Sequence, residues 1–229
     1  MRVIAGEAKG HPLKGPPKGP RGTGTRPTSD KVKGAIFSML EAMLVSSGVG
    51  PPGGRSAEPK ELPSGGDEDD GPGEATADEA TSPGLWAGTR IIDLYAGTGA
   101  LGIEALSRGA GHADFLDASP VCQRLIRDNL RGTGLAERAR VLGGSLPEAL
   151  ERSVELGSYD LALLDPPYGD PSLERTLSTL DGRGLLVPGA LVVVEHSRRG
   201  EPAAELGRLR LTRRRRHGDT EISIYRREA

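Results

Sequence analysis

The chain has 229 residues, enough for one catalytic domain with additions or at most two small domains. Hydrophobic residues make up only 35%, while 34 glycines and 18 prolines indicate a folded core diluted by a segment that does not fold. The single cysteine excludes an internal disulfide. No apolar stretch approaches the ~20 residues of a membrane span, and the first residues lack the apolar region of a secretory signal. We therefore expect a cytoplasmic protein that has no membrane partner and no metal.

Residues 1–45 form a basic N-terminal extension. A short strand or hairpin and a loop are expected first, followed by an amphipathic helix that Thr28 or Ser29 can cap. The helix follows from the apolar spacing of Val32, Ile36 and Met43, which places these side chains on one face. That face should pack on the main domain.

Residues 46–84 are dominated by Gly, Pro, Ser and acids, and their few apolar side chains show no helical or strand period. Such a segment cannot bury enough apolar surface to offset its ordering entropy, so we predict a disordered, inert insertion. It holds nine acidic and two basic residues, so the rest of the chain is net basic although the whole carries −2.

Residues 85–229 alternate strand and helix patterns, which predicts a mostly parallel α/β sheet with helices on both faces. The expected strands, seven in all, are residues 90–96, 113–117, 139–142, 161–165, 190–195, 209–213 and 220–225. The expected helices are residues 100–108, 120–131, 146–156 and 172–180. Only residues 214–219 separate the last two strands, too few for a crossover helix, so these strands should form an antiparallel hairpin.

The first strand runs into a glycine-rich turn that starts a helix, with glycines at 97, 99 and 102. This spacing suits a ligand at the carboxyl end of the sheet, but alone it fits a nicotinamide enzyme or an ordinary tight turn equally well. Asp93 inside the strand can meet a cationic or hydroxyl-bearing group. Asp117 ends the second strand, about 20 residues after the turn, where an acid binds ribose hydroxyls.

The fourth strand ends in Asp165, Pro166, Pro167 and Tyr168. Two prolines leave stiff, outward carbonyls, so Asp165 and the carbonyl of Pro166 can accept two hydrogen bonds from an amino group on a base, on which Tyr168 can stack. Holding these hydrogens localises the nitrogen lone pair toward a methyl donor, which is positioning and electrostatics rather than covalent catalysis.

These motifs, in this order, resemble the Rossmann-like class I methyltransferases that act on exocyclic amines. A narrower resemblance, to the bacterial 16S rRNA guanine-N2 methyltransferase D family, rests on the segments MRVIAGEAKGHPL, RPTSDKVKGAIFSML, IIDLYAGTGALGIEALSRGA, LLDPPYGD, VVVEHS and EISIYRREA. The match covers nearly the whole chain except the acidic insertion. The N-terminal segment makes it specific, because the glycine motif is common to many methyltransferases.

The resemblance implies S-adenosylmethionine as cofactor and 16S rRNA as partner, within a 30S subunit or an assembly intermediate. The residues it assigns to the cofactor are Asp93, Ala96, Gly97, Thr98, Gly99, Asp117, Ala118 and Ser145. Asp93, Gly97 and Gly99 would meet the methionine part and Asp117 the ribose. Related enzymes often place Asp or Asn after the third strand, where this chain has two glycines, which leaves Ser145 or a backbone group for the adenine.

The same resemblance gives Asp165, Pro166, Pro167 and Tyr168 to the target guanine. The residues expected to meet RNA are Arg2, Lys9, Arg21, Arg26, Thr28, Lys31, Arg213, Arg214, Arg215 and Arg216. The last four read as a dense positive tip on the final hairpin, for which a solvated turn is the alternative to phosphate binding. Nothing in the sequence indicates an obligate dimer, so a monomer is expected.

Other functions stay open on the sequence alone. A DNA adenine-N6 methyltransferase uses the same amine chemistry, although it normally needs a separate target-recognition domain. A glutamine-N5 methyltransferase normally has Asn at position 165, and a non-catalytic RNA-binding scaffold would not be stabilised by cofactor. We predict structural roles for Cys122 and His196, and an anchoring role for Trp86 where the fold resumes.

Overall fold

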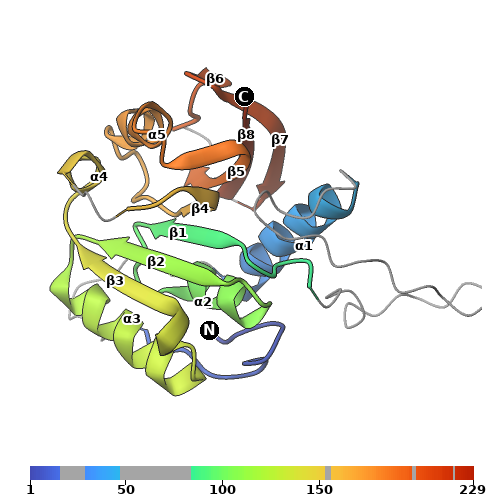
Figure 1. The fold of residues 1–229 in the computed structure, drawn as a ribbon, viewed down its shortest axis with the longest axis vertical. Coiled ribbons are helices and arrows are strands. Elements are labelled where there is room, and N and C mark those ends of the chain that lie inside the picture. The colour runs from blue at the N-terminus through green and yellow to red at the C-terminus, as the bar shows by residue number, and fades with distance from the viewer. Residues whose placement is uncertain (16–28, 47–83, 153–155, 198–199, 219) are drawn as a thin grey trace, which may run out of the picture.

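The computed structural model describes residues 1–15, 29–46, 84–152, 156–197, 200–218 and 220–229. Its centre is one eight-stranded sheet in the order β3-β2-β1-β4-β5-β8-β7-β6 (Figure 1). The strands are β1 (Arg90–Leu94), β2 (His112–Asp117), β3 (Ala139–Gly143), β4 (Tyr159–Leu164), β5 (Leu186–Ser197), β6 (Glu205–Leu206), β7 (Leu209–His217) and β8 (Thr220–Arg227). The first five run parallel, and β8, β7 and β6 extend the sheet antiparallel. The expected α/β class with a C-terminal antiparallel hairpin is confirmed.

Helices cover both faces of the sheet. They are α1 (Asp30–Ser46), α2 (Ala100–Ser107), α3 (Pro120–Thr133), α4 (Glu148–Arg152) and α5 (Leu173–Gly182), with a 3-10 turn at Ala136–Arg138. The apolar faces of α1, α2 and α3 pack on one side, and those of α4 and α5 on the other. Among the described residues no helix is long and apolar enough to cross a membrane.

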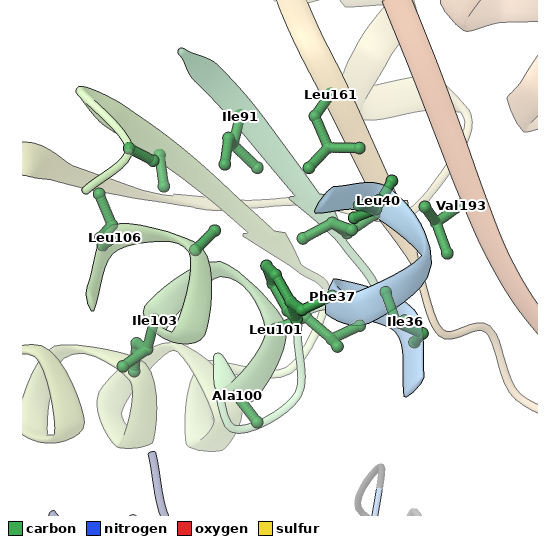
Figure 2. Close-up of a cluster of buried hydrophobic side chains, with 14 of the residues drawn as sticks. Ile36, Phe37, Leu40, Ile91, Ala100, Leu101, Ile103, Leu106, Leu161 and Val193 are labelled. Atoms are coloured by element: carbon green, nitrogen blue, oxygen red, sulfur yellow. The ribbon is translucent and has the colours of Figure 1, made fainter. Parts of the chain in front are cut away.

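The N-terminal helix α1 completes the core on the α2 side. Figure 2 shows Ile36, Phe37 and Leu40 of α1 beside Leu101 of α2 and the sheet residue Val193. Ser29 caps the helix, since its Oγ accepts a hydrogen bond from the Val32 N–H at 3.3 Å. The expected amphipathic helix therefore packs on the main domain.

Trp86 anchors the chain where the described structure resumes. Its ring is 1% exposed and lies 5.6 Å from the ring of Phe37, centroid to centroid. Its indole N–H donates to Glu41 Oε1 at 3.1 Å. The prediction for this residue is confirmed.

Several elements differ from expectation, and three of the differences have a local reason. The sheet has eight strands rather than seven, because the two-residue strand β6 pairs with β7 and is too short to leave a sequence pattern. Strand β1 ends at Leu94 instead of residue 96, since Tyr95 has a φ of 56°, outside the extended region. The helix expected over residues 146–156 is described only as the short α4.

The N-terminal residues form a closed loop with one isolated antiparallel bridge, between Arg2 and Pro12, in place of a regular hairpin. Gly6, with a φ of 82°, brings this loop onto the end of α2, where a Cβ would lie 1.7 Å from the Ser107 carbonyl oxygen. Only glycine allows that approach. The expected insertion lies almost wholly outside the described residues.

Candidate active site

Three adjacent parallel strands, β2, β1 and β4, end at the same edge of the sheet, so the loops that follow them lie side by side. In the register, Leu94 of β1 pairs with Leu116 of β2 and with Leu164 of β4. The next residues begin the glycine-rich turn, the Asp117 segment and the Asp165 segment. Neighbouring strands lie about 5 Å apart, so the structure gathers the expected cofactor and catalytic residues at one carboxyl edge.

Residues 95–99, here called the cofactor turn, have a strained backbone. Tyr95, Gly97 and Gly99 all have positive φ, of 56°, 55° and 78°. The N–H of Gly97 donates to Asp117 Oδ2 at 2.8 Å, which ties the turn to the end of β2. Gly99 is the N-cap of α2 and has no side chain that could cap the helix, so of its first N–H groups the one of Gly102 is bonded to Asp93 instead.

Asp93 lies beneath the turn rather than at its surface. It is 1% exposed, and its Oδ2 accepts from the Gly102 N–H at 2.9 Å. Burial raises the pKa of Asp93 well above its ordinary value, the Gly102 hydrogen bond opposes this, and the nearby charges of Asp165 and Asp117 add to it. Asp93 thus holds the start of α2, and its contact with the methionine part stays a prediction.

Asp117 organises the next loop. Its Oδ1 accepts from the Ser119 N–H at 2.8 Å, and its carbonyl oxygen accepts from Gln123 Nε2 at 3.0 Å. A Cβ on Gly143 would lie 2.8 Å from that same Gln123 nitrogen, so a larger residue there would displace the end of the Gln123 side chain. Gln123 was missed by sequence reasoning, and the glycine pair after β3 was its only signal.

Two smaller residues expected to bind the cofactor, Ala118 and Ser145, follow β2 and β3. Both are exposed, and the Gly144 N–H donates to the Asp117 carbonyl at 3.4 Å, which joins the two segments. The contact of Ser145 with the adenine and that of Ala118 with the cofactor stay predictions.

Residues 165–168, here called the catalytic loop, follow β4 directly. Asp165 is half-buried, Pro166 is buried and Pro167 is exposed. Tyr168 is 54% exposed, and its hydroxyl is hydrogen-bonded to Thr220 Oγ1 at 2.9 Å. An aromatic ring so open to solvent at the edge of a buried site can stack on a base brought from outside.

The arginine run, residues 213–216, is not at a hairpin tip, and that expectation is wrong. β7 continues to His217, which pairs with Thr220, so the run lies within the strand and the turn contains Gly218, with a φ of 63°. The pairing of β7 with β8 extends the strand through four charges that carry no alternating apolar pattern. Because strand side chains alternate, the run divides between two faces.

The partners in β8 identify the two faces. Arg213 and Arg215 pair with Ile224 and Ile222 and are exposed. Arg214 is half-buried, donates from Nε to Ser223 Oγ at 3.2 Å and forms an ion pair with Glu201. Of the four, Arg214 is thus committed to contacts within the protein.

Of the residues of the N-terminal extension that are expected to meet RNA, some are described by the structure and others are not. Arg2, Lys9 and Lys31 are exposed. The backbone N–H of Arg2 donates to Asp30 at 3.3 Å, which joins the first residues to the start of α1. Three further residues expected to meet RNA lie outside the described part of the chain: Arg21, Arg26 and Thr28.

A buried polar cluster between the extension and α2 was not predicted. Glu104 is fully buried, accepts from the N–H groups of Ile4 and Ala5 at 2.8 and 3.0 Å, and pairs with Lys33 at 3.3 Å and Arg108 at 3.0 Å. Burial lowers the pKa of Lys33, and the charge of Glu104 opposes that shift. The only signal in the sequence was a glutamate on an otherwise apolar helix.

His196 and Cys122 both occupy packed positions. His196 is 3% exposed, its Nε2 is hydrogen-bonded to Ser223 Oγ at 2.8 Å, and burial lowers its pKa. Cys122 is half-buried, and burial raises the pKa of its thiol. Within the described ranges, no group of three His, Cys, Asp or Glu side chains could hold a metal ion.

The chain is similar to known proteins along nearly its whole length. The family described as conserved hypothetical protein 95 matches residues 1–49 and 79–226. A Bacillus subtilis relative named "Putative rRNA methyltransferase YlbH" is 33% identical over 227 residues, which are 98% of each chain. "Ribosomal RNA small subunit methyltransferase D" of Escherichia coli is 27% identical over 231 residues, covering 100% of this chain and 91% of its own.

A solved structure agrees with these relatives. "Putative methyltransferase yhhF from Escherichia coli" superposes with a TM-score of 0.70 at 25% identity, covering 100% of this chain and 98% of that one. The class I methyltransferase fold and the resemblance drawn from the motifs are confirmed. The chain therefore belongs to the conserved hypothetical protein 95 family, and it is an S-adenosylmethionine-dependent methyltransferase similar to methyltransferase D.

Proposed function

We propose that the enzyme transfers a methyl group from S-adenosylmethionine to the exocyclic N2 of a guanine in 16S rRNA. One observation carries this proposal: the catalytic loop and the cofactor turn leave the sheet after the paired residues Leu164 and Leu94. An amine held by the first would therefore meet a methyl donor held by the second. The names of the relatives support ribosomal RNA as the substrate class.

The residues around the turn fit the cofactor. An ionised carboxylate has about four lone-pair sites. Asp117 accepts hydrogen bonds from the N–H groups of Gly97 and Ser119, which leaves acceptor capacity for the two ribose hydroxyls. The N-terminus of α2, which has no side-chain cap from Gly99, suits the methionine carboxylate. When bound, the cofactor supplies an electrophilic methyl group on a sulfonium.

The catalytic loop fits an aromatic amine. The guanine amine is a weak nucleophile because its lone pair is delocalised into the ring. Asp165 and the carbonyl of Pro166 accept hydrogen bonds from its two hydrogens and turn the lone pair toward the methyl carbon. Tyr168, exposed at the rim, stacks on the extruded base.

Basic residues lie next to this loop. Thr220, bonded to Tyr168, pairs with His217 at the end of the arginine run. Arg213, Arg215 and Arg216 are exposed on that strand and would bind RNA phosphates near the target base. We propose that the enzyme acts as a monomer on a 30S subunit or an assembly intermediate, where such phosphates are presented by a folded RNA.

The test is transfer of radiolabelled methyl from S-adenosylmethionine to 30S particles and to naked 16S rRNA, both from cells lacking this gene. The products are digested to nucleosides and identified. We expect label in N2-methylguanosine at one site. Label in DNA adenine instead would replace the proposal by a DNA methyltransferase, and bound cofactor without any transfer would indicate a non-catalytic scaffold.

A further inference from the structure

Met1 and Lys14, at the two ends of the N-terminal loop, are linked to the cofactor turn. Thr98, in the middle of the turn, donates from its hydroxyl to the sulfur of Met1 at 3.8 Å. Its carbonyl oxygen accepts from Asn129 Nδ2 at 2.9 Å, and the same Asn129 side chain binds the backbone of Lys14. One buried side chain on α3 thus joins the turn to the N-terminal extension.

The bonding of Asn129 is specific to an amide. Its Oδ1 accepts from the Lys14 N–H at 2.8 Å, while its Nδ2 donates to the carbonyls of Lys14 and Thr98 at 3.1 and 2.9 Å. One end meets an N–H and the other meets two carbonyls, so the orientation of the amide is fixed by its partners. The residue is 2% exposed, and its bond to Thr98 is buried away from water.

The turn depends on the hydrogen bond from Asn129. Thr98 lies between Gly97 and Gly99, both with positive φ, and glycines offer little resistance to rotation. From inside, Asp117 fixes the Gly97 N–H and Asp93 fixes the N–H of residue 102. From outside, Asn129 fixes the Thr98 carbonyl, while the N–H of the same peptide, that of Gly99, donates to the Ala96 carbonyl at 2.7 Å. Without Asn129 only the second of these bonds holds the peptide between residues 98 and 99, so the turn is free to shift from the conformation that would bind the cofactor.

We propose that Asn129 is a positioning residue for the cofactor turn and that it transmits the placement of Lys14 to that turn. The second half rests on the proposed function, because it requires RNA contacts by the exposed Lys9 and Lys14 to shift the extension. RNA binding and cofactor binding are then coupled, and the coupling is equal in both directions.

The first test measures affinity for S-adenosylhomocysteine, the reaction product, by calorimetry without RNA. Both Asn129→Ala and Asn129→Asp lose the hydrogen bond that fixes the Thr98 carbonyl, and we expect each to weaken binding by about tenfold. The control is Glu104→Gln, which also loosens the extension but contacts no residue of the turn. It should lower the melting temperature and leave the affinity within about twofold. Unchanged affinity in the folded Asn129 variants overturns the proposal.

The second test uses a matched pair at an exposed position. Lys14→Pro removes the N–H that donates to Asn129, whereas Lys14→Ala keeps that N–H and removes only the charge. We expect weaker S-adenosylhomocysteine binding in Lys14→Pro and wild-type binding in Lys14→Ala. Equal affinities in the two variants overturn the transmission from Lys14, and the pair remains informative if substitutions of Asn129 fail to fold.

The third measurement is affinity for S-adenosylhomocysteine with and without saturating 16S rRNA. In the wild type we expect a several-fold difference, and in Lys14→Pro we expect that difference to disappear. A difference retained in Lys14→Pro overturns the coupling. If the wild type binds no RNA the proposed function fails, yet the RNA-free measurements still decide whether Asn129 positions the turn.

Discussion

The two halves of the active site are held in different ways. The cofactor turn is fixed by three side chains from three elements: Asp93 from β1, Asp117 from β2 and Asn129 from α3. The catalytic loop ends in Tyr168, which is 54% exposed and is anchored through its hydroxyl to Thr220. A small methyl donor binds best to a turn that is already in its binding conformation. A folded RNA needs an accessible surface. The segment proposed for the small ligand is therefore the more tightly bonded of the two.

The largest effect should come from Asp165→Ala, which removes an acceptor for the amine and leaves every residue of the turn in place. We expect methyl transfer to fall by about 10²–10³-fold or more, because the acceptor acts in the transition state. Affinity for S-adenosylhomocysteine should stay close to wild type. A loss of both would show that the two halves do not have separate roles.

Gly102→Ala tests how tightly the cofactor half is packed. An added Cβ would lie 2.4 Å from the Phe115 ring, so we expect a loss of about 1–3 kcal/mol in unfolding free energy. For a chain of this size that lowers the melting temperature by roughly 2–4 °C per kcal/mol. Gly182→Ala is the control, since nothing lies within 4 Å of its Cβ. Equal melting temperatures would mean that Phe115 relaxes freely.

The RNA-binding side of the site, which comprises the catalytic loop and the exposed arginines beside it, is tested by neutralising Arg213, Arg215 and Arg216 together. RNA affinity should fall, and the slope of its logarithm against log salt should drop by about 0.7 for each phosphate that the variant no longer neutralises. Arg214→Ala should leave that slope unchanged, because Arg214 is engaged with Ser223 and Glu201. An unaltered slope in the triple variant would identify the run as a solvated strand.

A smaller, pH-dependent effect is expected for Asp93→Asn. Burial raises the pKa of Asp93, so the folded protein binds this proton more tightly than the unfolded chain. Wild-type stability is therefore lost as pH rises from the unfolded value of about 3.9 toward the folded pKa. Asparagine keeps an acceptor for Gly102 and does not ionise. In thermal unfolding from pH 4 to 8, the melting temperature of the variant should rise relative to that of the wild type as the pH increases. A difference in melting temperature that does not change with pH would contradict this.

The smallest effect is expected from deleting residues 50–78, which the family match leaves out. Shortening a loop changes its closure free energy only slowly with length, so transfer to RNA should stay within about twofold of wild type. The rate is measured on 30S particles beside the full chain. A larger loss would assign the acidic insertion a role in the RNA-binding side of the site.

The sequence predicted the parts of the molecule that have local patterns. Alternating strand and helix signals predicted the parallel sheet, and the glycines at 97 and 99 with Asp165–Tyr168 predicted two segments that the structure brings to one edge of the sheet. The two-residue β6 was too short to predict. β7 was cut at Arg213 because its pairing with β8, not its composition, extends it to His217.

Contacts between distant residues could not be predicted. Glu104 meets Ile4 and Ala5 across about a hundred positions, and Asn129 meets Lys14 across 115. No local sequence pattern at the polar residue indicates which backbone group it will contact, and none at the backbone group indicates the polar residue. The fold could therefore be predicted from the sequence, whereas the hydrogen bonds that hold the cofactor turn could not.

The same distances have a consequence for synthesis on the ribosome. The extension emerges first, but its docking residues, Glu104, Ser107 and Asn129, are made about a hundred residues later. At about 5–20 residues per second that interval lasts roughly 5–20 s. During it the basic extension has only the start of α1 to contact, through Arg2, Asp30 and Lys33. The bracing of the cofactor turn is therefore completed only when Asn129 has been made and Lys14 returns to it.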